Sequence, residues 1–418
     1  MSGKPTLVVL ALLIALPALH AQEPKAGTWL QWRGPNRDGF SPGTDWPDRI
    51  AGNSLKVIWE FKELGESYSG PIVTADRVFT TETVNKKIER IRCLDRKTGK
   101  QIWAKEWQGS TTVPFFAARN GAWIRSTPAC DSECIYVAGI RDVLVCLAIA
   151  DGKELWRADF VKEFESPLPS FGFVCSPLLD ESFVYVQAGN HFAKLDKKTG
   201  KVLWKTLKEG DAMMGSAFSS PVFAKLAGKE QIVVQTRTRL AGVDKATGSV
   251  LWEKKIPSFQ GMNVLTPVVL GDSVFTSTYG GNTRLITASL DSADKGPTES
   301  WTLKYEGYMT TPVVIKEHAY LFGKDRRFIC IDMKTGKERW RSDQRYGEYW
   351  NIVARNDKML ALDNSGKLLL IKANTDKFEL LDERQVSKAE TWAHLAVVGD
   401  EVFIRDLFGL TAYRWGGK

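Results

Sequence analysis

The sequence predicts an all-β protein, an eight-bladed β-propeller built from four-stranded antiparallel blades. Three observations predict it: one pattern recurs along the chain, its spacing is that of a four-stranded blade, and the last copy lacks a strand that an earlier segment can supply. The composition agrees, because 43% hydrophobic and 25% charged residues are ordinary for a packed globular protein.

The recurring pattern is a polar turn followed by tryptophan. Five segments place Trp four residues after Gly, as in LDKKTGKVLW, a sixth (LDSADKGPTESW) has one extra residue, and a seventh (NTDKFELL) ends in Leu. Asp can bond the turn backbone and Gly supplies a positive φ, so each copy indicates a tight hairpin into a last strand. Side chains alternate along that strand, so the large ring has a fixed direction and can pack between blades. The predicted blade-docking residues are Trp59, Trp103, Trp156, Trp204, Trp252, Trp301, Trp340 and Leu380.

The spacing and the chain ends predict how the ring closes. Successive copies are 39 to 53 residues apart, the period of a four-stranded blade. After the seventh unit, HLAVVGDEVFIRDLFGLTAYRW supplies only three strands, whereas VIWEF around Trp59 is an isolated strand with no hairpin before it. Pairing the two would complete the eighth blade and remove an open sheet edge. We therefore expect the propeller over residues 56–418, preceded by an N-terminal arm (22–55) that crosses it in a mainly structural role.

The first 21 residues are typical of a signal peptide. Lys4 precedes an apolar run from Leu7 to Leu16, which is followed by Pro17 and by a small residue, Ala21, at the end of the segment. The run is too short to span a bilayer. The first cysteine is Cys93, so no lipidated cysteine would follow the leader. We expect a soluble periplasmic or extracellular protein, not a lipoprotein, with no integral membrane segment after leader removal. Its formal charge of +8 is dispersed, so nucleic acid is not an expected partner.

Five of the six cysteines separate into two groups, and Cys175 is not assigned to either. Cys130 and Cys134 flank Asp-Ser-Glu at a predicted hairpin turn, where a local disulfide and two free thiols are both compatible with the spacing. Cys93, Cys146 and Cys330 recur at one position of the repeat, which favours buried free thiols.

The repeated motif A/C-L-D-x-x-T-G-K-x-x-W resembles the pyrroloquinoline-quinone (PQQ) repeat of quinoprotein alcohol dehydrogenases and of BamB-like propellers. The resemblance covers roughly residues 57–415, and the opening WLQWRGPNRDGFSPG is similar to a Trp- and Gly-rich segment that precedes many such propellers. It implies the fold named above. A repeat of this kind does not by itself imply a bound cofactor.

The site residues that the resemblance implies for an enzyme are not found in the sequence. Quinoprotein dehydrogenases hold PQQ with calcium in the central channel, stacked in many members on a disulfide between adjacent cysteines. This sequence has no adjacent cysteine pair, and no calcium carboxylate or catalytic aspartate can be matched to it. Its His and Cys residues have no metal-binding spacing. We assign no catalytic residue, no metal ligand and no cofactor, while PQQ with calcium stays an alternative. For Asp325, between cations in FGKDRRF, a solvated salt bridge is favoured over a catalytic base.

A ligand site is predicted at one mouth of the channel. The connections into the innermost strands, which begin at motifs such as TPVV, should surround that mouth, and each carries an aromatic or Met side chain. The insertion at 108–124, with Phe115, Phe116 and Arg119, would overhang it. A binding funnel and packing beneath the arm are both compatible with this pattern. The predicted rim residues are Tyr68, Trp123, Arg125, Phe173, Phe218, Tyr308, Tyr349, Trp350 and Trp392, with Met262, Asn263 and Met309 beside them.

Three functions are compatible with these observations. The favoured one is a non-catalytic scaffold that binds an exported protein or peptide, as the BamB-like resemblance implies. The second is a PQQ-dependent oxidoreductase acting on alcohols or sugars. The third is a binder of carbohydrate or another small ligand, because rim aromatics suit sugar faces. The channel interior would discriminate between them: convergent carboxylates beside an open pocket would favour the enzyme, and an apolar plug would favour the scaffold.

Overall fold

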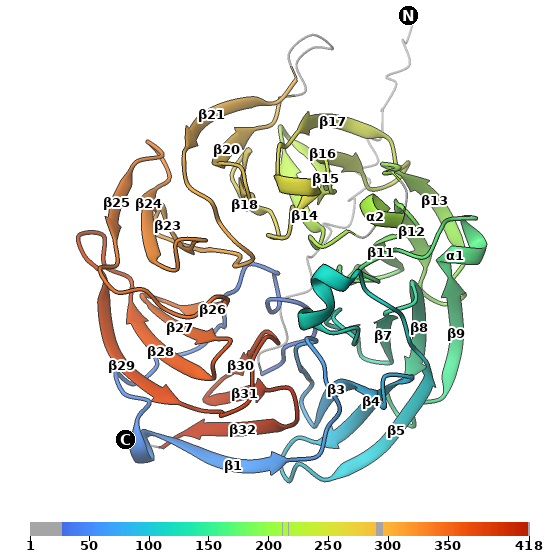
Figure 1. Cartoon of the computed structure of the whole chain (residues 1–418), viewed down its shortest axis with the longest axis horizontal. Helices are drawn as coiled ribbons and strands as arrows, with labels where there is room; N and C mark the ends of the chain where they lie inside the picture. Colours follow the sequence, from blue (N-terminus) through green and yellow to red (C-terminus); the bar gives the residue numbers. More distant parts are fainter. Residues whose placement is uncertain (1–26, 211, 216, 290–295, 417–418) are drawn as a thin grey trace, which may run out of the picture.

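The computed structural model is a ring of eight four-stranded sheets, which confirms the predicted eight-bladed propeller (Figure 1). It describes residues 27–210, 212–215, 217–289 and 296–416. The predicted signal peptide, residues 1–21, lies outside the described residues. None of the helices in the described part of the chain is long and apolar enough to cross a bilayer.

Each blade is an antiparallel meander that runs from the axis outward, and we number the blades 1 to 8 in chain order. Blade 1 contains β2 (Ile72–Val73), β3 (Arg77–Val84), β4 (Ile88–Asp95) and β5 (Gln101–Gln108), and blade 2 contains β6 (Ala129–Cys130), β7 (Cys134–Gly139), β8 (Val143–Ala148) and β9 (Glu154–Asp159). Blade 3 contains β10 (Leu178–Leu179), β11 (Phe183–Ala188), β12 (His191–Asp196) and β13 (Val202–Thr206), and blade 4 contains β14 (Val222–Leu226), β15 (Lys229–Gln235), β16 (Arg239–Asp244) and β17 (Val250–Lys255). Blade 5 contains β18 (Val268–Leu270), β19 (Ser273–Ser277), β20 (Thr283–Thr287) and β21 (Thr298–Leu303). Blade 6 contains β22 (Val313–Ile315), β23 (His318–Phe322), β24 (Phe328–Asp332) and β25 (Glu338–Arg341), and blade 7 contains β26 (Trp350–Arg355), β27 (Lys358–Asp363), β28 (Lys367–Lys372) and β29 (Glu379–Gln385). In the described part of the chain, five short helices interrupt the loops: η1 (Gly52–Ser54), η2 (Phe115–Asn120), α1 (Phe160–Glu163), α2 (Ala212–Gly215) and η3 (Phe259–Gly261).

Blade 8 closes the ring from both ends of the propeller, as predicted. It contains β30 (Ala396–Val398), β31 (Glu401–Arg405), β32 (Leu410–Trp415) and, as its outermost strand, β1 (Leu55–Phe61). β1 pairs antiparallel with β32, from Leu55 opposite Trp415 to Phe61 opposite Leu410. The two terminal segments are thus joined by a strand ladder, which leaves no gap between blades 7 and 1.

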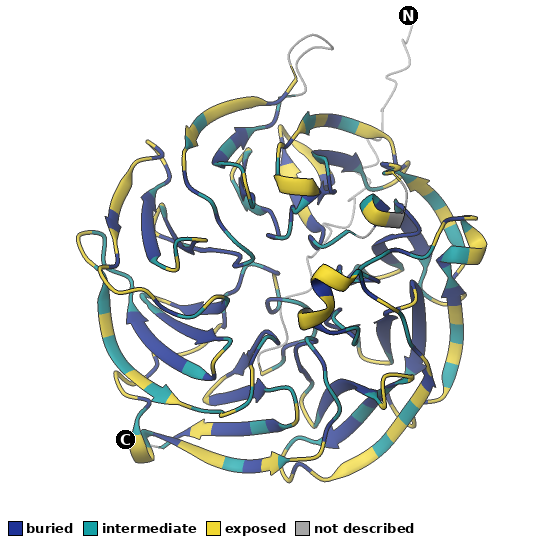
Figure 2. Cartoon of the chain, in the orientation of Figure 1, coloured by how far each residue is buried: buried dark blue, intermediate teal, exposed yellow. Residues whose placement is uncertain are grey.

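Burial falls from the axis to the rim of each blade (Figure 2). The middle strands are buried on both faces: β8 is buried at all but one of its six positions. The outer strands alternate, and β5 has only Trp107 buried. Faces that pack against neighbouring blades account for the first pattern, and one solvent-facing side accounts for the second.

The turn glycine of one blade lies against the tryptophan of the preceding blade. The Trp156 indole donates to the carbonyl of Lys197 at 2.8 Å, and a Cβ on Gly200 would lie 2.5 Å from that ring. Because Gly200 also has a φ of +72°, no other residue fits without strain. The same close approach recurs for Gly99 and Trp59, Gly152 and Trp103, Gly248 and Trp204, and Gly336 and Trp301.

The remaining predicted docking positions are placed differently. Trp340 donates to Asn374 in blade 7 at 2.7 Å, as Trp156 does to blade 3. Trp252 instead donates to the Gln231 side chain of its own blade, although its ring packs with residues of blade 5. Leu380 is 37% exposed on the outer strand of blade 7.

The arm lies inside the ring and makes hydrogen bonds along the inner strands (Figure 1, blue segment at the centre). Trp29 forms a two-way backbone bridge with Val73, and Ser41 donates to the carbonyl of Ala354. Other arm residues form hydrogen bonds with the inner edges of four more blades. Leu30 bonds blade 2, Arg37 bonds blade 3, Trp32 bonds blade 5 and Arg33 bonds blade 6. The arm therefore fills the channel instead of only crossing the propeller.

A buried carboxylate couples blades 1 and 2 and makes stability depend on pH. Glu89 is fully buried, accepts from Trp107 Nε1 and from the Ile140 N–H at 2.7 Å each, and burial raises its pKa to about 7. Between the ordinary carboxyl pKa and 7, the folded state holds a proton that the unfolded state has lost. Glu89 therefore stabilises the fold less as pH rises through this window, by about 3 kcal/mol in total.

We expect the substitution Glu89→Gln to remove this contribution. The difference in unfolding free energy between wild type and Glu89→Gln, measured by urea denaturation at several pH values, should fall as pH rises from 5 to 8. All other titrating groups cancel in that difference. Parallel curves for the two proteins would contradict the assignment.

Candidate functional site

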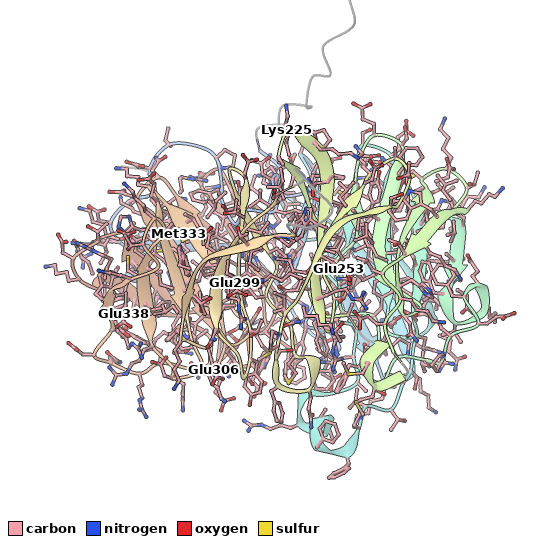
Figure 3. All side chains as sticks on the ribbon, turned by 90° about the horizontal axis from the view of Figure 1, so that it is seen from above. Lys225, Glu253, Glu299, Glu306, Met333 and Glu338 are labelled. Atoms are coloured by element: carbon pink, nitrogen blue, oxygen red, sulfur yellow. The ribbon has the colours of Figure 1, made fainter. Side chains whose placement is uncertain are left out.

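One face of the ring, here called the mouth face, carries every connection from an outer strand to the next inner strand. Each inner strand starts at this face and runs away from it, and the second strand runs back. The turn between the second and third strands of every blade therefore also lies at the mouth face. Figure 3 shows Glu306, in such a connection, on the same side as the projecting η2 helix, and Lys225 on the opposite side. Phe115 and Phe116 in η2 are 91% and 59% exposed. Large exposed apolar side chains at one face mark it as a surface for contacts.

A cavity of about 630 Å³ opens at the mouth face over the channel axis, and we call it the funnel. No Asp or Glu of the described residues lines it. Its polar lining consists of Arg125, Ser176, Ser220, Arg237, Gln260, Thr266 and Thr311. Its apolar and aromatic lining consists of Trp32, Tyr68, Phe116, Ala117, Phe171, Val174, Met213, Met214, Phe218, Met262, Val264, Tyr308, Met309, Tyr349 and Trp392.

The structure brings most of the predicted rim residues together and leaves three outside. Tyr68, Arg125, Phe218, Tyr308, Tyr349 and Trp392 line the funnel, as do Met262 and Met309. Phe173 and Trp350 do not, because they are 2% and 1% exposed and belong to the cores between blades. Trp123 packs edge-on behind Tyr68 at 5.4 Å. Asn263 is buried and donates to the carbonyls of Thr236 and Arg237.

Strand alternation explains which side chains reach the funnel. The chain enters each blade in an extended form, so residues two apart point the same way. Ser176, Ser220, Thr266 and Thr311, next to the inner strands, face the axis, and the residue two positions before each one lines the funnel. Those lining residues are Val174, Phe218, Val264 and Met309, and the same offset gives Tyr68, Arg125, Tyr349 and Trp392 in the other blades. Phe173 and Trp350 fall on the alternate positions and therefore point into the blades.

The neck of the funnel is held by hydrogen bonds that run from blade to blade. Gly70 N–H donates to Thr127 Oγ1, Thr127 N–H to Ser176 Oγ and Ser176 N–H to Ser220 Oγ, at 2.9, 3.2 and 2.9 Å. Thr266 N–H makes the same bond to Thr311 Oγ1 at 3.1 Å. The recurring Ser-Pro and Thr-Pro pairs supply these hydroxyls. These bonds connect the inner strands of blades 1 to 4 and of blades 5 and 6 around the arm.

The arm forms the floor of the funnel. Trp32 lines the cavity, and its indole donates to Thr266 Oγ1 at 3.0 Å. Behind it, His394 contacts the Trp32 ring edge-on at 4.9 Å, and burial lowers its pKa to about 3. His394 therefore stays neutral and contributes no charge at physiological pH.

The charges in the funnel wall are positive. Burial lowers the pKa of Arg125 and of Arg237 to about 10, so both remain cationic at neutral pH. Each guanidinium lies over aromatic rings, Arg125 over Tyr68 at 5.6 Å and Arg237 over Phe218 at 4.5 Å. These contacts hold the rings in place and give an otherwise apolar wall a positive potential.

Several lining residues were not predicted from the sequence. Phe171 comes from the connection between blades 2 and 3, Met213 and Met214 come from α2, and Arg237 comes from the β15–β16 turn. Trp32 reaches the funnel only because the arm enters the channel. The two-residue offset before each Ser/Thr-Pro pair was the available signal, and it would have identified Val174 and Val264.

Two other features of the sequence, the Cys130/Cys134 pair and Asp325, lie outside the funnel. Cys130 and Cys134 are free thiols on opposite faces of blade 2, since Cys130 pairs with Ile135, the strand neighbour of Cys134. Cys130 packs toward blade 1 and Cys134 toward blade 3. Asp325 pairs with Arg341 at 2.7 Å and does not line the funnel, in agreement with the salt-bridge interpretation.

Comparisons with known proteins agree with this architecture. The family model described as outer membrane protein assembly factor BamB matches residues 87–342, more than half of the chain. No curated protein sequence matches the chain.

Among solved structures, BamB from Moraxella catarrhalis is similar at a TM-score of 0.62 and 13% identity, over 87% of this chain and 98% of that one. Quinohemoprotein alcohol dehydrogenase ADHIIG from Pseudomonas putida HK5 is similar at 0.53 and 12%, over 94% and 81%. The computationally designed Ika8 protein is similar at 0.57 and 11%, over 85% and 100%. At these identities the likeness concerns the fold alone.

Proposed function

The chain belongs to the family described as outer membrane protein assembly factor BamB, and from this premise we propose that it is a non-catalytic binding scaffold. Its funnel takes up an apolar, extended segment of another exported protein. The observation that carries the proposal is the funnel wall, where aromatic rings and four methionines surround about 630 Å³ of space. A pocket of this size and lining is typical of a binding site for an apolar group.

The methionines suit a site that accepts varied apolar side chains. Met213, Met214, Met262 and Met309 come from three different connections and face one cavity. Unbranched, polarizable side chains of this kind adapt to ligands of different shape. The exposed rings of Phe115 and Phe116 extend the apolar surface beyond the cavity. A bound segment that is longer than the funnel would need such a surface.

The residues around the funnel do not fit a calcium-bound quinone. Calcium takes six to eight oxygen ligands, with carboxylates prominent among them. Among the described lining residues, the side chains that carry oxygen are two serines, two threonines, one glutamine and the tyrosines. The arm also fills the channel below. We therefore assign no step to such a group.

Binding can be measured with a fluorescently labelled unfolded polypeptide, reduced and carboxymethylated α-lactalbumin, by anisotropy. We expect saturable binding, and we expect Phe218→Ser to weaken it at least tenfold, because that ring lines the funnel and burying a Phe contributes about 1.5–3 kcal/mol. The matched control is Phe408→Ser, a 53% exposed ring in the β31–β32 turn of the same face that does not line the funnel. It should change the affinity less than twofold.

Two results would overturn the proposal. One is equal binding by wild type and the Phe218→Ser variant. The other is saturable binding of PQQ with calcium accompanied by dye-linked alcohol oxidation, which would make the protein an oxidoreductase. For the carbohydrate alternative, Trp392→Ala is the informative variant, since Trp350 is core and its loss would affect folding.

A further inference from the structure

Two arginines of the arm are buried in the channel without a carboxylate partner. Arg33 and Arg37 are 1% and 3% exposed, and neither forms an ion pair with any described residue. Their guanidinium groups donate to carbonyls, Arg33 to Pro312 at 2.7 Å and Arg37 to Pro177 at 2.7 Å. Burial lowers their pKa values to about 10 and about 9, so both stay charged at neutral pH. Asp38 is close enough to Arg33 to raise its pKa but forms no ion pair with it, so this buried charge is only partly compensated. Buried charge that is not fully compensated is costly, which points to an anion nearby.

Arg33 has hydrogen-bond donors that the described residues do not satisfy. Its Nη2 atom donates to the carbonyls of Asp38 and Pro312, but Nε and Nη1 are buried without an acceptor. The indole Nε1 of Trp350, a residue 1% exposed, also lacks an acceptor in the described structure. Other buried donors, such as the Trp46 and Trp415 indoles, also lack an acceptor among the described residues, so the cavity that Arg33 and Trp350 share is what sets this pair apart.

Both residues line one small cavity next to the neck. Its volume is about 10 Å³, close to that of one water-sized sphere, and its other lining includes Tyr349, Asn351 and His394. His394 is neutral, and the Asn351 amide donates to the carbonyl of Ala393. No described Asp or Glu lines the cavity. The charge in its wall is therefore the Arg33 guanidinium.

We propose that this cavity binds a single halide-sized anion, chloride in a physiological medium. The anion accepts from Arg33 and Trp350 and offsets the positive charge of the arm. It thereby joins the arm to blade 7 at the base of the funnel. The site is independent of the funnel ligand, and its test does not depend on the proposed function.

Bromide in place of chloride gives a direct test. Crystals of wild type grown in sodium bromide should show an anomalous peak between the Arg33 guanidinium and the Trp350 indole. An ordered water there, with no anomalous peak, overturns the proposal.

Thermal stability gives a second, independent test at constant ionic strength, with sodium gluconate replaced stepwise by sodium chloride. We expect the unfolding temperature of wild type to rise by roughly 2–5 °C between 1 and 100 mM chloride. Trp350→Phe, which keeps an aromatic ring and removes the donor, should shift the half-saturating chloride concentration at least tenfold upward. Arg33→Met should abolish the dependence. The matched control is Arg355→Met, because Arg355 is equally buried but bonded to Ser41 and Thr44 of the arm. Arg355→Met should keep the dependence on chloride. If wild type, Trp350→Phe and Arg355→Met respond equally to chloride, the proposal is overturned, and this outcome can be read even if Arg33→Met does not fold.

Discussion

Replacing Trp29 with Ala should lower the free energy of unfolding by about 3–5 kcal/mol, the cost of deleting a large ring from a packed core. Trp29 is 1% exposed, bridges Val73 through two backbone hydrogen bonds of 2.7 and 2.9 Å, and stacks on the His394 ring at a centroid distance of 6.3 Å and an interplanar angle of 25°. It packs in the core cluster that joins the arm to blades 1, 7 and 8. Its loss should therefore loosen the arm as well as the core.

Two measurements check this prediction. Urea denaturation gives the stability loss. Trypsin in native buffer should cleave after Arg37 in Trp29→Ala and not in wild type, where Arg37 is buried in the channel. Trp392→Ala is the control, since this ring lies at the mouth and its indole is bonded to exposed Glu390; it should cost roughly 1 kcal/mol. A loss below about 1 kcal/mol in Trp29→Ala, with the arm still protected, would show that the arm is held elsewhere.

Replacing Gly200 with Ala should cost about 2–4 kcal/mol. The residue has a φ of +72°, which costs an L-residue about 1 kcal/mol, and the new methyl would lie 2.5 Å from the Trp156 ring. Relieving that clash requires the indole to move, which strains its 2.8 Å hydrogen bond to Lys197 in the next blade. One methyl group would thus weaken a contact between blades 2 and 3.

Gly228 provides the matched control for this prediction. It has nearly the same φ, +75°, but nothing lies within 4 Å of a Cβ there. Gly228→Ala should therefore show only the conformational cost, about 1 kcal/mol, in the same urea titration. Equal losses in the two variants would mean that the Trp–Gly contact contributes nothing beyond backbone strain.

The blade count and the closing strand could be predicted from the sequence because they depend on local features. A turn with Gly, a Trp four residues later and a strand without its own hairpin can each be recognised within a few residues. Six of the nine residues predicted at the rim line the funnel, and their role in binding stays a prediction. Trp123 packs behind Tyr68, whereas Phe173 and Trp350 point into the blades because side chains alternate along the extended entry segment.

The path of the arm could not be predicted in this way. Trp32 bonds Thr266, Arg33 bonds Pro312 and Ser41 bonds Val397, and these three partners are more than 230 residues away in the chain. Nothing within the arm's own sequence specifies such partners, because carbonyls and hydroxyls at the inner strand ends are common to every blade.

The sequence by itself determined the eight blades, their order and the strand that closes them, since period and turn chemistry are written in short segments. Only the tertiary structure decided that the arm fills the channel and that Arg33 and Trp350 line one small cavity. It also decided that the mouth is an apolar funnel, with no Asp or Glu among the described residues that line it. The physical reason is that these features arise where single side chains from many blades converge. Such convergence depends on the closed ring and leaves no linear pattern in the chain.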